Sequence, residues 1–239
     1  MSTSSIHAVA KVLDTSARVC VLTGAGVSAE SGVATFRDPD GLWARFSPYE
    51  LASMDGFLAN PDRVRDWYNY RRAIINSVEP NEGHVTLATL EKLWGENFTL
   101  VTQNVDRLHQ RAGSVRVLEV HGNIHENRCS NCEAVRSDDE LVCPACSGAM
   151  RPNVVWFGED LPQDVFAAAE EAARTCDVML VVGTSADVWP AAGLPHTAKM
   201  AGAQIVEVNP NQTSLTPHVH HVLNGTSAVV LPQLLEAMA

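Results

Sequence analysis

A glycine turn directly follows an apolar run near the start of the chain. Residues 18–23 are strand-like, and residues 24–29 read GAGVSA. This order fits the form G-x-G-x-x-G/A, in which a strand, a tight turn and a helix N-terminus surround a dinucleotide phosphate. Gly24 permits the turn, Gly26 lets the backbone approach a pyrophosphate, and the small Ala29 lets the helix pack close to the strand. Short glycine turns are common, so this motif alone is a weak signal.

The segment after the turn has an unusual composition. Residues 32–38 read GVATFRD and follow neither a helical nor a strand period. They place the aromatic Phe36 and the cationic Arg37 just past the phosphate turn. The pattern indicates a loop that covers a bound ligand, with Arg37 beside the phosphates. The simpler alternative for Arg37 is a surface salt bridge.

Apolar runs alternate with helical patterns along the rest of the chain. The strand-like runs are 18–23, 98–102, 116–120, 177–182 and 204–208, and the helical patterns are 5–14, 60–77, 83–94, 162–174, 190–201 and 228–238. Alternation of this kind is typical of an α/β fold, in which a Rossmann-like parallel sheet carries helices on both faces.

Polar or glycine residues follow five of these runs. They are the pairs Thr23-Gly24, Thr102-Gln103, Val120-His121, Gly183-Thr184 and Val208-Asn209. Ligands of open parallel sheets bind beyond the carboxyl ends of the strands. The five pairs therefore predict one ligand crevice at one edge of the sheet.

Two segments interrupt the alternation and predict a small second lobe. Residues 33–80 form a loop and a helical insert, and residues 124–150 hold cysteines and little apolar sequence. We therefore expect a nucleotide-binding domain built from 1–32, 81–123 and 151–239, and a small lobe built from the two insertions.

Four cysteines form two C-x-x-C pairs. Cys129 and Cys132 are separated by ten residues from Cys143 and Cys146. Paired knuckles suit a tetrahedral Zn²⁺ ion, and four thiolates leave no open position, so the zinc would be structural. Two disulfides, a redox C-x-x-C or four unrelated thiols are the alternatives. Cys20 and Cys176, beside strand-like runs, are expected in the core.

Composition limits the classes of partner. Hydrophobic residues make up 46% of the chain, and the formal net charge is 17 − 28 = −11. This charge opposes a nucleic-acid or anionic-membrane surface and suits basic peptides. No secretory signal or membrane-spanning stretch is visible, so we expect a cytoplasmic protein.

Several motifs occur together in a recognisable order. They are TQNVD at 102–106, His121-Gly122, the four-cysteine module, VVWFGE at 154–159, GTS at 183–185 and VNPN at 208–211. With the 24–43 run they resemble the sirtuin family of NAD-dependent protein-lysine deacylases over about 18–232. The resemblance implies the same two-lobed architecture, with NAD and acyl-lysine meeting in the cleft.

The resemblance implies a general base at His121. In the family, nicotinamide leaves the ribose C1′, the acyl oxygen attacks that carbon, and a histidine accepts a proton relayed from the ribose hydroxyls. Free lysine and O-acyl-ADP-ribose are the products. An imidazole suits this because its ordinary pKa is near neutrality. A lone histidine is more often structural, and the chain has 9.

Asn104 is the second residue with an implied catalytic role, beside Asp106 at the nicotinamide and ribose site. The simpler alternative for Asp106 is a cap for the following helix. The full set of implied cofactor contacts is Gly24, Ala25, Gly26, Ser28, Glu30, Thr35, Phe36, Arg37, Trp43, Gln103, Asn104, Val105, Asp106, Gly183, Thr184, Ser185, Asn209, Pro210, Asn211 and Ser227.

The 154–159 segment reads as extended. By resemblance, the substrate peptide pairs with it as an added strand, through Val155, Trp156, Phe157, Gly158 and Glu159. This mode reads the peptide backbone more than its side chains. An ordinary edge or core strand is the alternative. Trp189 is expected to help close the peptide side of the cleft.

A Tyr-x-x-Arg pair bears on the acyl group. Tyr68 and Arg71 share a helix face, and a phenol beside a guanidinium suits a carboxylate. By resemblance to sirtuins that prefer succinyl-, malonyl- or glutaryl-lysine, both lie deep in the acyl pocket. Alternatively Trp67, Tyr70 and Ile74 form the core stripe and leave the pair solvated. Asp38-Pro39-Asp40 departs from the usual small-residue loop and leaves the acyl preference open.

Four other functions compete. A plain deacetylase would make no use of Tyr68 and Arg71, and a mono-ADP-ribosyltransferase would use the same NAD site without an acyl pocket. A nicotinamide-dependent oxidoreductase usually has an acidic residue about 20 positions beyond the glycines, and Glu50 fits this loosely. A zinc-ribbon binding module would leave most of the chain unexplained.

Overall fold

A six-stranded parallel sheet forms the centre of the larger domain. The computed structural model describes residues 3–35 and 47–238. In spatial order, the strands are β3 (Val117–Glu119), β2 (Phe98–Thr102), β1 (Val19–Thr23), β7 (Val178–Val182), β8 (Gln204–Asn209) and β9 (His221–Asn224). Each neighbouring pair is parallel. The α/β fold class is therefore confirmed.

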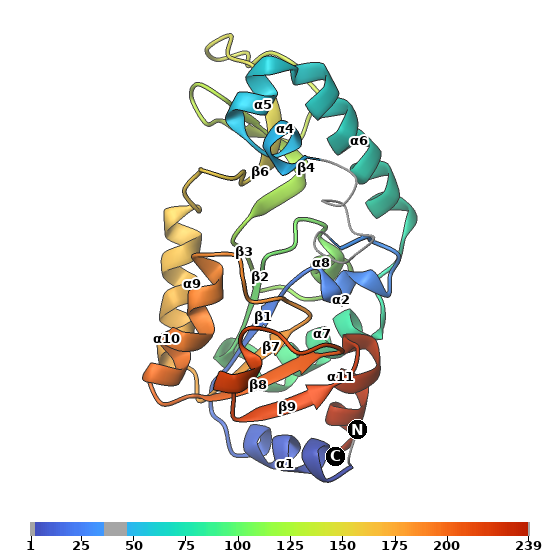
Figure 1. Cartoon of the computed structure of the whole chain (residues 1–239), viewed down its shortest axis with the longest axis vertical. Helices are drawn as coiled ribbons and strands as arrows, with labels where there is room; N and C mark the ends of the chain where they lie inside the picture. The colour runs from blue at the N-terminus through green and yellow to red at the C-terminus, as the bar shows by residue number, and fades with distance from the viewer. Residues whose placement is uncertain (1–2, 36–46, 239) are drawn as a thin grey trace.

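Helices cover both faces of this sheet (Figure 1). One face carries α1 (Thr3–Asp14), α7 (Glu82–Trp94) and α11 (Ser227–Glu236), and the other carries α9 (Gln163–Thr175) and α10 (Leu194–Met200). Successive strand residues point to opposite faces: Val21 and Leu180 join the first core, whereas Leu22 and Val181 join the second. Strands buried on both faces explain why these runs are continuously apolar.

Short elements complete the larger domain. They are α2 (Gly26–Ala29), α8 (Leu108–Arg111) and the 3₁₀ turns η1 (Gly95–Asn97), η2 (Ala191–Gly193) and η3 (Thr216–His218). The prediction of a helix over 190–201 is wrong for the first turn, where the structure has the 3₁₀ turn η2. The strand β9 was missed because its burial alternates at the sheet edge and only Leu223 is fully buried.

The small lobe stands above the sheet in Figure 1 and combines helices with a second sheet. Its helices are α4 (Pro48–Leu51), α5 (Met54–Ala59) and α6 (Pro61–Ser77). The antiparallel sheet has the order β5 (Val135–Arg136), β4 (Gly122–Cys129), β6 (Met150–Val154). This sheet was not expected, because β4 reads GNIHENRC and lacks hydrophobic alternation. β6 lies almost wholly in the range assigned to the nucleotide domain, yet it pairs with β4.

Helix α6 begins at a well-formed cap. The Asn60 side chain accepts a hydrogen bond from the Arg63 N–H at 3.1 Å, and Pro61 occupies the first turn. The asparagine satisfies one backbone N–H of the first turn that has no partner within the helix, and the proline has no N–H to satisfy. The buried residues of the helix are Val64, Trp67, Tyr68, Arg71 and Ile75. One face of α6 therefore forms the small-lobe core and carries two polar side chains into it.

No helix in the described ranges is both long and apolar enough for a membrane span.

Candidate active site

A cavity of about 230 Å³ lies where the carboxyl end of the sheet meets the small lobe. Its lining includes the phosphate turn, the strand end after β2, the second residue after β3, helix α6, the segment after β6 and the 188–190 segment. The expected site residues in this lining are Ala25, Ser28, Tyr68, Arg71, Gln103, Asn104, Val105, Asp106, His121, Val155, Trp156, Phe157, Gly158 and Glu159. Residues from five separate segments therefore surround one space.

The phosphate turn packs backbone against backbone on the turn that follows β7. The Gly26 N–H donates to the Gly183 carbonyl at 2.8 Å, and a Cβ on Gly26 would lie 2.8 Å from that oxygen. A Cβ on Gly24 would lie 2.7 Å from the Thr184 Cβ. Gly26 is therefore required because the neighbouring turn leaves no space for a side chain. The sequence predicted a different reason, which was the close approach of the backbone to a pyrophosphate. Ala29 is exposed, so its expected packing against the strand is wrong.

A buried polar network lies beneath this turn. Ser28 Oγ donates to Asp106 Oδ2 at 2.7 Å, and Asn104 Nδ2 donates to the Gly24 carbonyl at 3.0 Å and to Ser28 Oγ at 3.2 Å. Asp106 Oδ1 accepts the Leu108 N–H at 2.9 Å. Asp106 therefore satisfies the first N–H of α8, although Arg107 occupies the N-cap position and makes no side-chain cap bond, and Asp106 also lines the cavity.

Two buried histidines in this network were missed by sequence reasoning. His109 Nε2 lies 2.9 Å from Thr23 Oγ1, and His84 Nε2 lies 3.4 Å from Ser28 Oγ. Burial lowers the pKa of His84 to about 4 and that of His109 well below its ordinary value. Both rings are therefore neutral. A signal existed for His84, because Asn81 and His84 form a capping box at the start of α7.

The ring of His121 has a defined tautomer. Its Nδ1 lies 3.1 Å from the Gln103 carbonyl, which can only accept, so Nδ1 carries the proton and Nε2 keeps its lone pair. Burial lowers the pKa of His121, and the hydrogen bond to Gln103 partly opposes this. Gly122 has φ +79°, and a Cβ there would lie 2.2 Å from the Asn153 carbonyl, so glycine is required beside the histidine.

The remaining strand ends are tied to one another. Thr184 Oγ1 donates to Gln103 Oε1 at 3.3 Å, and Asn209 Nδ2 donates to the Thr184 carbonyl at 3.0 Å. Ser185, Pro210 and Asn211 belong to the same two turns and do not line the cavity. The Gln103 Nε2 atom is buried and donates to no described group.

Glu30 and Ser227 meet at the start of α11, away from the cavity lining. The Glu30 carboxylate accepts from Thr226 Oγ1 at 2.8 Å and from the Ala228 N–H at 3.0 Å. The described contacts thus make Glu30 a cap of α11, and Ser227 packs against Gly83. Thr35 is half-buried and outside the lining. Phe36, Arg37, Trp43 and the 38–40 segment lie outside the described residues.

Tyr68 and Arg71 are buried at the small-lobe end of the cavity. Their exposed fractions are 1% and 6%, whereas Tyr70 is 59% exposed. The alternative that left the pair in solvent is therefore wrong. Tyr68 Oη accepts a hydrogen bond from Trp156 Nε1 at 2.8 Å, and the Arg71 guanidinium lies 5.0 Å from the Trp67 ring centroid. Burial raises the pKa of Tyr68 to about 12 and lowers that of Arg71.

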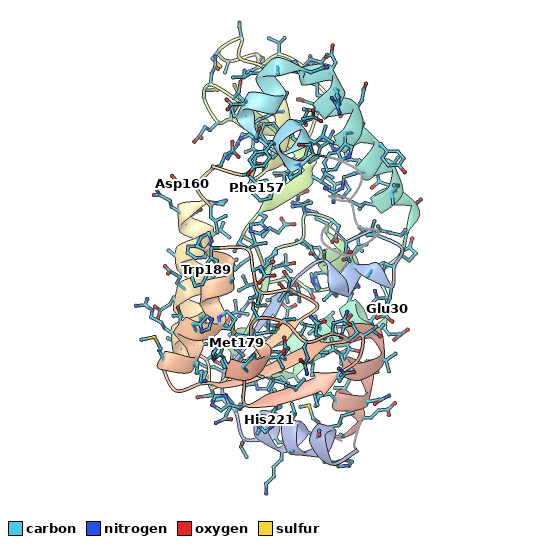
Figure 2. The ribbon with its side chains drawn as sticks, in the orientation of Figure 1. Glu30, Phe157, Asp160, Met179, Trp189 and His221 are labelled. Carbon is cyan, nitrogen blue, oxygen red and sulfur yellow. The ribbon has the colours of Figure 1, made fainter. Side chains whose placement is uncertain are left out.

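The segment after β6 is extended for a shorter distance than expected. β6 ends at Val154, the Val155 N–H donates to the His121 carbonyl at 2.9 Å, and a turn follows at Phe157-Gly158. Glu159 closes this turn by accepting the Trp156 N–H at 2.9 Å. Phe157 and Trp189 are 47% and 69% exposed; both line the cavity, and Figure 2 shows them on the small-lobe and α10 sides.

The comparisons with known proteins agree with this arrangement. A model described as "Sir2 family" matches residues 24–190. The chain belongs to the Sir2 (sirtuin) family. Among its relatives, this sirtuin is 47% identical to the NAD-dependent protein deacylase 2 of Pyrobaculum aerophilum, over 95% of this chain and 94% of the relative. It is also 47% identical to the NAD-dependent protein deacylase of Mycobacterium tuberculosis, over 92% and 98%.

Solved structures extend the likeness to the sirtuin fold. A complex of a Sir2 homologue mutant with ADP-ribose has a TM-score of 0.92 and 41% identity, covering 97% of this chain and 95% of the other. A Sir2 homologue–NAD complex has a TM-score of 0.89 and 40% identity, covering 97% and 94%.

The four clustered cysteines of this sirtuin fit one zinc ion. Cys129, Cys132, Cys143 and Cys146 have sulfur atoms within 4.8 Å of one another. The Cys129–Cys146 and Cys132–Cys143 sulfur distances are 3.4 and 3.7 Å. Tetrahedral Zn–S bonds of about 2.3 Å separate sulfurs by about 3.8 Å, so the site fits zinc. None of the four lines the cavity, which agrees with a structural metal. Cys20 and Cys176 are buried, as expected.

Gly26→Ala should destabilise the fold and weaken NAD binding, because the new Cβ would meet the Gly183 backbone. We expect a loss of about 1–3 kcal/mol in the free energy of unfolding, measured by denaturant titration, with NAD affinity measured by calorimetry. Gly193→Ala is the matched control: its Cβ would lie 2.9 Å from an atom of the exposed Trp189 ring, which can move. Equal stability of the two variants would contradict the close backbone packing of the phosphate turn against the turn that follows β7.

Cys143→Ser should remove the metal and lower the melting temperature, because three thiolates and a hydroxyl hold Zn²⁺ poorly. Elemental analysis should find one zinc per wild-type chain and a substoichiometric amount in the variant. Cys176→Ala, which removes a buried thiol outside the cluster, should keep the full metal content. Wild-type protein without zinc would refute the site.

Proposed function

We propose that this sirtuin is an NAD-dependent protein-lysine deacylase that removes succinyl and malonyl groups as well as acetyl groups. Acyl-lysine, NAD and one water give nicotinamide, O-acyl-ADP-ribose and free lysine. The observation that carries the proposal is the single cavity that joins His121 and the Gln103–Asp106 strand end to the buried pair Tyr68 and Arg71. The names of its relatives support the deacylase activity.

The residues at the sheet end fit NAD. The buried Gln103 Nε2 donor has no described acceptor, and a ribose hydroxyl or nicotinamide oxygen would satisfy it. Asn104 is held by Gly24 and Ser28, so its side chain is fixed before a ligand binds. When bound, NAD supplies the reactive ribose carbon and receives the acyl group. The chain's own residues orient the sugar.

His121 is the general base of the proposal. Because Nδ1–H is held by the Gln103 carbonyl, the Nε2 lone pair is the ring's one proton acceptor. A ribose hydroxyl placed against the cavity wall would give its proton to this atom. Burial lowers the pKa of His121, so the base remains neutral at physiological pH.

The peptide would bind at the cavity mouth, between the Phe157-Gly158 turn and Trp189. Two Sir2 structures support a peptide ligand: one holds a deacetylated p53 peptide (33% identity, TM-score 0.86), and another holds a myristoylated histone peptide (34% identity, TM-score 0.79). An added strand would pair its backbone with the segment after β6. The net charge of −11 would attract basic lysine-containing segments.

The buried end of the cavity supports the proposal of an acidic acyl group. A guanidinium remains charged when buried, and its planar fork of donors matches the two oxygens of a carboxylate, which carries the opposite charge. The carboxylate of a succinyl group would place such a charge beside Arg71 and offer an acceptor to Tyr68. Hydrogen bonds between charged partners are shorter and about twice as strong as neutral ones.

Arg71→Met should lower kcat/KM for a succinyl-lysine peptide about 10- to 100-fold, the loss expected for a charge-assisted hydrogen bond. Turnover of the matched acetyl-lysine peptide should survive, because methionine keeps the volume of the side chain. Mass spectrometry of free lysine peptide and O-acyl-ADP-ribose measures both. Arg63→Met is the control on the same helix, because Arg63 is exposed and pairs with Glu50 at 3.0 Å.

Two outcomes would change the function. Acetyl turnover alone, indifferent to Arg71, would make the protein a plain deacetylase. Labelling of protein with ADP-ribose without release of lysine would make it a mono-ADP-ribosyltransferase.

His121→Ala should lower kcat by about 10²- to 10⁴-fold, the usual contribution of a general base. In the wild type, a lowered pKa means that the neutral imidazole persists into more acidic solution. The kcat/KM profile should therefore stay level from neutral pH to about 6.5 and fall only below that value. His221→Ala should leave turnover unchanged, because His221 belongs to the edge strand β9, does not line the cavity, and lies well below Phe157 in Figure 2. An acidic limb above pH 7 would contradict the assignment.

A further inference from the structure

The contact between Trp156 and Tyr68 fixes the direction of one proton. Trp156 Nε1 lies 2.8 Å from Tyr68 Oη, and the two side chains are 2% and 1% exposed. An indole N–H can only donate, so the phenol oxygen must accept. A hydroxyl has a single proton, which must then point away from the indole. Among the described residues, no acceptor for this proton is found.

The hydroxyl proton without a described acceptor belongs to Tyr68, which lines the cavity. Arg71 lines the same end and is close enough to perturb the phenol electrostatically. Because burial holds the pKa of Tyr68 at about 12, the hydroxyl is a donor throughout the physiological range. A carboxylate between the two would receive hydrogen bonds from both. Without the indole, the phenol oxygen would lose its only described partner and its proton would have no fixed direction.

The indole also contacts a buried cation. The guanidinium carbon of Arg151 lies 4.1 Å from the centroid of the Trp156 ring. Arg151 is 2% exposed, pairs with Glu159 and donates to the Val154 carbonyl at 3.1 Å. Glu159 in turn accepts the Trp156 backbone N–H. A cation on one face of the ring and a carboxylate on its backbone thus restrict the indole to one orientation.

We propose that Trp156 is a positioning residue for acyl specificity, which acts through Tyr68. The indole N–H donates to the phenol oxygen, so the phenol O–H remains able to donate a hydrogen bond to the acyl carboxylate. Acetyl-lysine has no carboxylate to receive that proton, so the contact favours succinyl- and malonyl-lysine selectively. The inference rests on the proposed acidic-acyl activity and adds a residue that the Tyr-x-x-Arg pair does not contain.

A double-mutant cycle tests the inference on one readout, the ratio of kcat/KM for succinyl- over acetyl-lysine peptide. Tyr68→Phe should lower the ratio about tenfold and Trp156→Phe about fivefold, the effect of one hydrogen bond. In the double variant, Trp156→Phe should add nothing to Tyr68→Phe, because the tryptophan acts through the missing hydroxyl. Effects that multiply, or a Trp156→Phe ratio within twofold of wild type, would overturn the inference.

Two further variants separate the effect of the indole hydrogen bond from the effect of packing around the indole ring. Phe57→Leu alters the ring that packs 5.5 Å from the indole and keeps the N–H, so it should lower the melting temperature and leave the ratio unchanged. Replacement of Trp156 by benzothienylalanine keeps the shape and substitutes sulfur for N–H, so it should reproduce the lower ratio even where Trp156→Phe fails to fold. A normal ratio in this variant would contradict the inference.

The two proposals fail in distinguishable ways. If the wild type does not remove succinyl groups and Arg71→Met has no effect, the acidic-acyl activity is refuted and the role of Trp156 falls with it. If the wild type removes succinyl groups and depends on Arg71, while the benzothienylalanine variant keeps the wild-type ratio, only the role of Trp156 is refuted.

Discussion

The turns that follow β1 and β7 touch through their backbones, and the rest of the site is built on that contact. A side chain at Gly24, Gly26 or Gly183 would lie within 3 Å of backbone or Cβ atoms of the opposing turn. Since parallel strands end at the same edge, the segment after β2 meets both turns: Asn104 donates to Ser28 Oγ, and Thr184 donates to Gln103. Such spacing is a property of the backbone, and other side chains at these glycines would separate the turns.

Beneath those turns, the site depends on polar groups that are buried and almost fully satisfied. Ser28, Asn104 and Asp106 share hydrogen bonds, and two neutral histidines fill the space behind them. A buried polar group without partners costs about 1–3 kcal/mol, so this network holds each member in one place. Two atoms in this region have no described partner, His109 Nδ1 and the Gln103 amide nitrogen, and of the two residues only Gln103 lines the cavity, where a ligand would supply an acceptor.

The sequence predicts those features of this architecture that depend on local residue patterns, and it misses those that depend on tertiary packing. Continuous apolar runs such as Val178–Val182 identify buried parallel strands, and the cysteine spacing identifies the zinc module, because both signals are local. The β4–β6 sheet was missed because polar side chains occupy its strands. The burial of Tyr68 and Arg71 was ambiguous, since helical periodicity allowed two faces of α6. The packing of α6 against α4, α5, β4 and β6 selects between them.

The small lobe shows why that packing matters. Arg151 is a buried cation paired with Glu159, and such a pair is weak support for stability, because hydrophobic replacements of similar volume are often as stable. Its value here is geometric. Glu159 fixes the Phe157-Gly158 turn at the cavity mouth, and Arg151 fixes the indole that contacts Tyr68 at the buried end. One ion pair therefore contacts both the turn at the cavity mouth and the indole that binds the phenol at the buried end, so under the proposed function both ends of a bound acyl-lysine would meet parts of one connected unit.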